Sequence, residues 1–120
     1  MAHDPAFGDW VREHLAGLGP IEIKPMFGGA SVYADGLIFA LLDDGVVWLK
    51  ADEINAPLLQ GAGARQFTYP TKGGTQMAMA YWSLPESALD DADEAVDWAR
   101  RSIDASLRKA AAKKPRKPKP

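Results

Sequence analysis

The sequence predicts an α+β fold, in which helices flank a mainly antiparallel sheet of about five to six strands. Short apolar segments alternate with glycine turns through the centre of the chain, and segments with helical periodicity stand near both ends. The central turns contain Asp35-Gly36 and Asp43-Asp44-Gly45. Asp-Gly between apolar segments is a strong β-hairpin signal, because type I′ turns need positive φ at both central residues.

An amphipathic helix is predicted at the start of the chain. Asp4 is a suitable N-cap and Pro5 a suitable first helical residue. One apolar face follows at helical spacing and consists of Phe7, Trp10, Val11, Leu15 and Leu18. Gly17, Gly19 and Pro20 are expected to end this helix.

A meander of strands is predicted next, at residues 21–27, 30–34, 37–42 and 46–50. Pro25 cannot donate a hydrogen bond to a neighbouring strand, so the first strand is expected at an edge or with a bulge. The uninterrupted apolar run at 37–42 favours a central strand that is covered on both faces.

A short helix and a second hairpin are predicted in the next part of the chain. Asp52 is expected to cap a helix that runs to about residue 60, with Ile54, Leu58 and Leu59 directed inward. Strands at residues 65–69 and 75–83 are then expected to pair through an intervening glycine turn.

A long helix is predicted at the end, where Asp91 and Glu94 have the spacing of a capping box. Trp98 is expected to cover an edge of its buried stripe, which consists of Ala92, Ala95, Val96, Ala99, Ile103 and Leu107. We expect residues 1–109 to form one domain. Residues 110–120 are expected to form a disordered Lys/Pro-rich tail, because they contain little that could be buried.

The composition is that of an ordinary globular domain, with 120 residues, 47% hydrophobic and 25% charged. The absence of cysteine excludes disulfides, a thiol nucleophile and thiolate metal sites. The polar, acidic N-terminus is not that of a signal peptide, and no apolar run has the length of a membrane span. A cytoplasmic protein without membrane association is therefore expected.

Charge is distributed unevenly along the chain. Residues up to Leu107 include all 16 Asp and Glu but only seven Lys and Arg, a net charge of −9. The other basic residues follow without any acid, and they are Arg108, Lys109, Lys113, Lys114, Arg116, Lys117 and Lys119. Basic residues that alternate with proline can follow a phosphate backbone, so weak non-specific nucleic-acid binding is one interpretation. A tail that only neutralises the acidic body is the other.

No catalytic or metal-binding constellation stands out, and we expect no cofactor. His3 and His14 are the only histidines, too few for a site of three or four ligands. No serine stands in a Gly-x-Ser-x-Gly turn. The carboxylates at residues 90–97 are best explained by the start of a helix, where negative charge is favourable.

Several short segments occur in an order that resembles the amino-terminal domain of the TfoX/Sxy family. The segments are Met26-Phe27-Gly28-Gly29, Tyr33, Asp35-Gly36, Phe39-Ala40-Leu41, Leu49-Lys50-Ala51-Asp52, Phe67-Thr68-Tyr69, Lys72-Gly73-Gly74, Met79-Ala80-Tyr81, Pro85-Glu86 and Trp98-Ala99. The resemblance covers about residues 8–107 and implies a compact domain with a curved antiparallel sheet. Namesake members regulate natural competence as transcriptional co-activators. They carry a second, helical carboxy-terminal domain, where a basic tail stands in this sequence.

The resemblance and the residue types together predict a non-enzymatic regulatory or adaptor domain that acts by protein contact, with the transcription machinery as the implied partner class. Two glycine loops are candidate interaction sites: Met26, Phe27, Gly28 and Gly29 in one, and Tyr69, Lys72, Gly73 and Gly74 in the other. Turn geometry alone also explains these glycines.

Two alternative functions remain open. The first is direct, non-specific nucleic-acid binding, and the second is binding or conversion of a small ligand at the glycine loops. The strand aromatics Tyr33, Trp48, Tyr69, Tyr81 and Trp82 form either a base-stacking platform or ordinary packing. The acidic balance of the body favours packing.

Overall fold

The computed structural model describes residues 4–26, 29–70, 73–74 and 76–113. Its strands are β1 (Glu22–Met26), β2 (Gly29–Ala34), β3 (Leu37–Asp43), β4 (Val46–Lys50), β5 (Gln66–Pro70) and β6 (Gln76–Ser83). Its α-helices are α1 (Pro5–His14), α2 (Ala56–Gly61) and α3 (Ala92–Lys113). Two 3₁₀ turns accompany them, η1 (Ala16–Leu18) and η2 (Glu86–Leu89). The predicted α+β class is confirmed.

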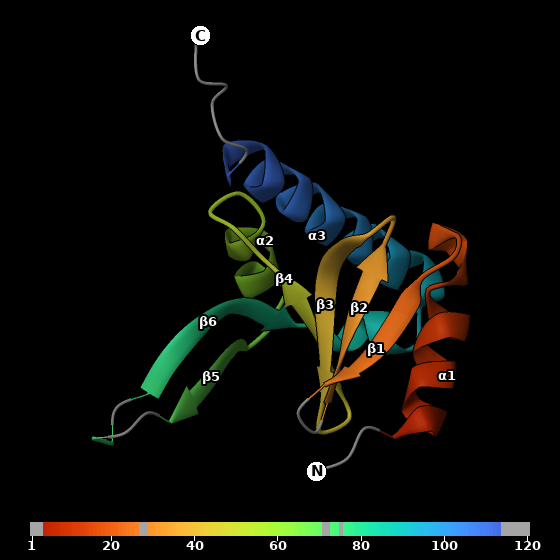
Figure 1. Ribbon diagram of the computed structural model, residues 1–120, viewed down its shortest axis with the longest axis horizontal. Coiled ribbons are helices and arrows are strands. Elements are labelled where there is room, and N and C mark those ends of the chain that lie inside the picture. Colours follow the sequence, from red (N-terminus) through yellow and green to blue (C-terminus); the bar gives the residue numbers. More distant parts are fainter. Residues whose placement is uncertain (1–3, 27–28, 71–72, 75, 114–120) are drawn as a thin grey trace, which may run out of the picture.

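The strands form one antiparallel sheet in the order β1-β2-β3-β4-β6-β5 (Figure 1). The hairpin turns follow the sequence prediction, because Asp35-Gly36 and Asp44-Gly45 all have positive φ. The β5–β6 hairpin projects away from the β1–β4 part of the sheet. The hairpin continues the sheet because β6 pairs with β4. Ser83 of β6 lies opposite Trp48 of β4, and Tyr81 lies opposite Lys50.

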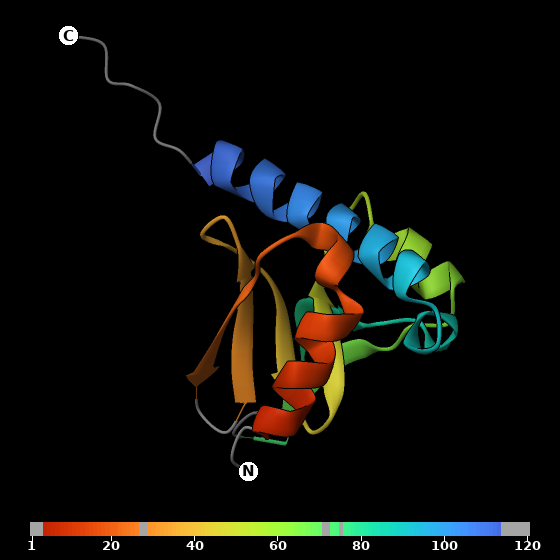
Figure 2. The same cartoon turned by 90° about the vertical axis from the view of Figure 1, so that its right-hand side faces the viewer.

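The core lies between one face of the sheet and the helices. Val32, Ala40, Leu42 and Leu49 come from β2, β3 and β4, and they pack with apolar residues from α1, α2 and α3. Figure 2 shows α1 and α3 crossing the sheet on this side. Directly paired residues of neighbouring strands lie on the same face of a sheet. Val32, Ala40, Leu49 and Trp82 are paired in this way from β2 to β6, and all four belong to the core or pack against it.

The position of each strand agrees with its sequence. The apolar β3 is central, between β2 and β4, and β1 with Pro25 forms an edge of the sheet. α1 begins as predicted, because the Asp4 carboxylate accepts a hydrogen bond from the Ala6 amide. Its apolar face buries Val11, and Leu15, the C-cap residue directly after the helix, is also buried.

The predicted middle helix is wrong in its start and in two of its three inward residues. The helical residues begin only at Ala56, and Asp52 instead caps a turn by accepting hydrogen bonds from the amides of Ile54 and Asn55. Leu59 is fully buried, whereas Ile54 is 56% and Leu58 50% exposed. Asp52 accepts hydrogen bonds from backbone amides as a helix cap does, but the residues that follow it form a turn. The side chains after Asp52 therefore do not point where a helix would direct them.

The predicted stripe of the long helix also needs correction at its ends. Ala92 and Leu107 are exposed, while Trp98 is buried. The buried face includes Ser102 and Ser106, and the Ser106 hydroxyl donates to the Ile38 carbonyl oxygen. Small polar side chains therefore let α3 approach β3 closely. The helix runs to Lys113, past the predicted domain boundary at residue 109, and residues 114–120 lie outside the described part.

Candidate functional site

The first predicted glycine loop is partly described, and its glycine has a structural role. Met26 ends β1 and pairs with Gly29 at the start of β2. A Cβ on Gly29 would stand 2.4 Å from the Leu42 carbonyl oxygen, so only glycine allows this approach of β2 to β3. Phe27 and Gly28 lie outside the described residues.

The second predicted loop lies at the tip of the β5–β6 hairpin. Tyr69 belongs to β5, and Gly73 and Gly74 have φ of 90° and 86°, which favours glycine. Lys72 lies outside the described residues.

The structure does not bring the two loops together. Gly29 is linked through β3 to the start of β4, whereas Lys50 at the end of β4 pairs with Tyr81, and β6 continues from there toward its hairpin tip. The flanking strand ends are well separated in Figure 1. Each loop stays a separate prediction as an interaction site.

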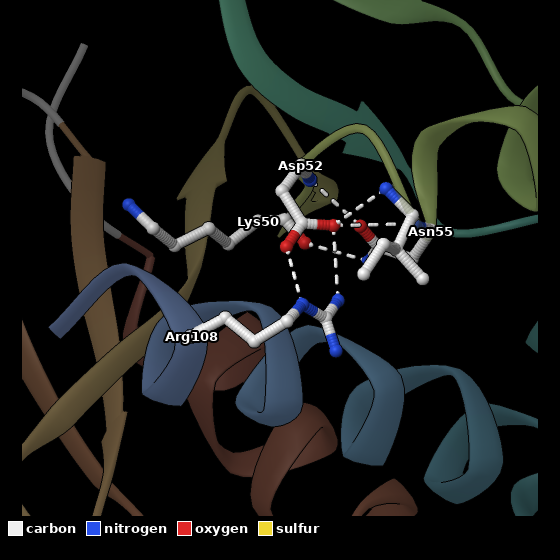
Figure 3. A network of polar contacts seen from close by, with 5 residues as sticks. Lys50, Asp52, Asn55 and Arg108 are labelled. Carbon is white, nitrogen blue, oxygen red and sulfur yellow. Dashed lines mark hydrogen bonds and ion pairs between the residues drawn. The ribbon is translucent and has the colours of Figure 1, made fainter. Parts of the chain in front are cut away.

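One residue of the predicted basic tail has a structural partner. The Arg108 guanidinium donates from Nε and Nη2 to the Asp52 carboxylate, at 2.6 and 2.9 Å. Figure 3 shows this side chain reaching from α3 to the loop after β4. Lys109 is exposed and Lys113 ends α3, while Lys114, Arg116, Lys117 and Lys119 lie outside the described residues.

Asn55 completes the polar network of Figure 3. Its side chain accepts a hydrogen bond from the Asp52 amide at 2.7 Å and donates to the Lys50 carbonyl oxygen at 3.1 Å. The Arg108 hydrogen bonds lower the pKa of Asp52 from 3.8 to about 2, and the amides of Ile54 and Asn55 add to this effect against partial burial. The network therefore ties the C-terminal part of α3 to the end of β4.

The face of the sheet opposite the helices carries cations placed over aromatic rings. Alternate residues of a strand point to opposite faces, so Trp48 and Lys50 lie opposite the core residues Val47 and Leu49. On this open face three cation–ring pairs form, with the cation 5.0–5.3 Å from the ring centroid: Lys24 on Tyr33, Lys50 on Tyr81 and Arg65 on Trp48. The separation is within the range of a cation–π contact.

Two of the rings beneath these cations, those of Trp48 and Tyr81, are buried and therefore not available for stacking. Trp48 is 6% exposed and lies against Phe67, with 4.7 Å between ring centroids. Burial, with a smaller contribution from Tyr33, raises the pKa of the Tyr81 hydroxyl. The Trp48 Nε1–H is buried without a hydrogen-bond partner among the described residues. The prediction of packing is the better description of these two rings.

Sequence reasoning missed the cations of the open face. The aromatic residues were interpreted from the net charge of residues 1–107 as a whole, and not from the charges on their own face of the sheet. Lys24 and Lys50 alternate with core residues in their strands, so strand periodicity could have placed them on one face. Arg65 lies on the same face because its amide donates to the Ser83 hydroxyl of β6, and Ser83 pairs with Trp48 of β4. A single sequence does not show which strands pair.

A cleft of about 770 Å³ lies at the end of the sheet where β4 begins. Phe7 and Trp10 of α1, which stack with 5.8 Å between ring centroids, line it with Leu84 and Leu89. The other lining residues include Glu86 and Asp90 at the two ends of η2, and Arg65. The cleft is thus aromatic and apolar, with carboxylates among its lining residues.

His14 is used in packing beside this cleft. Its ring stacks on Trp10 at 4.5 Å between centroids, and its Nε2–H donates to the Ala88 carbonyl oxygen at 2.7 Å. Among the described residues, no group of three or more His, Cys, Asp and Glu is placed to hold a metal ion. No helix in the described ranges has the length and apolarity needed to cross a membrane.

These features define a small α+β domain with an open antiparallel sheet and helices on one face. Residues 13–106 match the family model described as the TfoX N-terminal domain, and the chain belongs to this family. Protein Sxy of Escherichia coli (strain K12) is 32% identical over 97 residues, which are 81% of this chain and 46% of that protein. The chain thus spans about half the length of this curated relative.

Proposed function

We propose that this chain is a non-enzymatic regulatory or adaptor domain that acts by contact with a partner protein. The basic residues at its C-terminal end add a weak, non-specific affinity for DNA. The open face of the sheet is the contact surface, and the observation that carries this is its set of three cations placed over aromatic rings. By resemblance to the namesake regulators of competence, the partner belongs to the transcription machinery.

The three cations of the open face indicate the chemistry of the partner. Lys24, Lys50 and Arg65 stand out because residues 1–107 carry a net charge of −9. The rings beneath them restrict the cations to a fixed area, which lowers the entropic cost of pairing with an acidic group. The expected partner presents carboxylates and apolar groups, and its binding weakens as salt is raised.

The test compares two variants with equal changes of charge. Lys24→Glu/Lys50→Glu/Arg65→Glu reverses the open face, and Arg12→Glu/Arg101→Glu/Lys109→Glu reverses exposed residues of α1 and α3. A nuclease-treated lysate is passed over each immobilised protein, and a captured protein is then purified for titration. We expect at least about tenfold weaker binding by the open-face variant alone, because reversal replaces several attractions with repulsions. Equal binding by both variants would contradict the proposal.

Direct nucleic-acid binding is the second candidate, and the same three cations favour it. Trp48 and Tyr81 are buried, so their rings are not available for stacking on bases. Nucleic acid would therefore be bound through contacts of the cations with phosphates. Because Arg108 is held by Asp52, six basic residues remain in the C-terminal set, and the logarithmic salt slope on duplex DNA is at most about −5 if only they bind. A steeper slope that the open-face variant reduces would support this candidate. A slope unaffected by that variant would assign binding to the tail.

A further inference from the structure

We infer that the cleft beside α1 receives the Lys/Pro segment, residues 114–120, of a second copy of this chain. The proposed self-association is separate from the contact proposed for the open face. It rests on the lining of the cleft, the sequence of the segment, and the distance between them along the molecule.

The segment has the sequence of a polyproline-type ligand. Pro115 and Pro118 enclose two basic residues, Arg116 and Lys117, in a Pro-x-x-Pro spacing. A polyproline II helix repeats every three residues, so the two prolines would share one edge and the basic residues would project from the others. Such segments dock in grooves lined by aromatic side chains, because they lose little entropy on binding.

The cleft offers matching groups. The stacked rings of Phe7 and Trp10, inclined by 9° to each other, provide an aromatic side to the cleft, and Leu84 and Leu89 extend its apolar lining. Glu86 and Asp90 can pair with the Lys and Arg side chains of the segment. Arg65 is the opposing charge in the lining, and its guanidinium lies over the Trp48 ring.

The segment cannot reach the acidic part of its own cleft. Asp90 lies directly before the first residues of α3, whereas residues 114–120 follow its other end. From Ala92 to Lys113 the helix is about 32 Å long. Seven extended residues span at most about 25 Å. Figures 1 and 2 both place the C-terminal end of α3 and the β3–β4 turn at opposite ends of the molecule. The pairing therefore occurs between copies.

Sedimentation of the full chain at several concentrations and at low salt tests the inference. The wild type should show a mass that rises with concentration, and higher salt should reverse the rise. Glu86→Lys/Asp90→Lys should weaken the association at least about tenfold. Asp97→Lys/Asp104→Lys makes the same change of charge at exposed positions on α3 and should leave it unchanged. A chain that stays monomeric, or equal effects of both variants, would overturn the inference.

A charge exchange keeps the test valid if one variant folds poorly. A second variant replaces Lys114, Arg116, Lys117 and Lys119 by Glu and should also lose self-association. Mixing it with Glu86→Lys/Asp90→Lys restores opposite charges between the altered segment of one copy and the altered cleft of the other. The mixture should associate again, and failure to do so while both variants retain the wild-type circular dichroism would overturn the inference. Pro115→Ala/Pro118→Ala, with all charges kept, should weaken association if the prolines bind the aromatic side of the cleft.

Discussion

At Gly29 the backbones of β2 and β3 approach so closely that the side chain must be a hydrogen atom. A methyl group there would stand 2.4 Å from the Leu42 carbonyl oxygen, which belongs to the backbone of the central strand β3. Gly29→Ala should lower the free energy of unfolding by about 1–3 kcal/mol, because the strands must separate to relieve the overlap. Urea denaturation measures this change.

Gly61→Ala is the matched control for that substitution. A Cβ on Gly61, the last residue of α2, meets no atom within 4 Å. Alanine is the better helix former, so the expected change is a stabilisation of at most about 1 kcal/mol. A loss of stability equal to that of Gly29→Ala would contradict the role assigned to the close approach.

The Asp52–Arg108 pair should make stability depend on pH in the acidic range. The pKa of Asp52 falls from 3.8 to about 2 on folding, so the folded state binds the proton less readily than the unfolded state. The contribution is fully present above about pH 4 and is lost as pH falls through about 2. Asp52→Asn should therefore lower the free energy of unfolding at neutral pH by about 1–2 kcal/mol, allowing for partial exposure of the pair.

Urea denaturation of the wild type and Asp52→Asn from neutral pH down to pH 2 measures that contribution. The difference in stability between the two proteins should shrink below about pH 4. Asp104→Asn removes an exposed carboxylate from α3 and should change stability by less than about 0.5 kcal/mol. A difference for Asp52→Asn that stays constant down to pH 2 would contradict the pKa shift.

At the scale of elements, Leu59 is the one buried residue with which α2 enters the core, beside the partly buried Ala56. Leu59 is fully buried, while its neighbour Leu58 is half exposed. Leu59→Ala should cost about 2–5 kcal/mol of unfolding free energy, because it leaves a cavity between α2 and the sheet. Leu58→Ala should cost less than about 0.5 kcal/mol. Thermal or urea denaturation distinguishes this arrangement from the predicted helix, in which both leucines point inward.

The elements whose signals are local could be predicted from the sequence. Each hairpin between β2 and β4 depends on two adjacent residues, such as Asp44 and Gly45, and the sequence placed both turns correctly. α2 was misjudged because Ile54 and Leu58 have helical spacing while the turn formed by Asp52 precedes the helix. Spacing indicates which residues share a helical face only after the start of the helix is known.

The candidate sites depend on contacts between distant residues. Asp52 and Arg108 are 56 positions apart, and the cleft combines α1, the β3–β4 turn, the loop before β5 and η2. A single sequence gives no signal for such pairings. The basic segment could be recognised from the composition. Only the fold shows that Arg108, one of its cations, is paired with Asp52.

For the whole molecule, the two proposed surfaces should act independently, although both include Arg65. The open face uses cations on the sheet, and the cleft uses the carboxylates of η2. Glu86→Lys/Asp90→Lys should therefore abolish self-association and still retain the partner captured through the open face. Capture and sedimentation with the same preparation measure both properties. Simultaneous loss of both in a folded variant would show that the surfaces are coupled.

Pro25 in the edge strand has a consequence for protein solubility. A proline inside a paired strand directs its nitrogen away from the ladder, so the outer side of β1 lacks one amide donor near the C-terminal end of the strand. An approaching strand would find an incomplete row of hydrogen-bond groups there. The residue that restricts β1 to the margin of the sheet thus also protects that margin from amyloid-like growth. Pro25→Val should shorten the lag before fibrils form under agitation, as measured by thioflavin fluorescence.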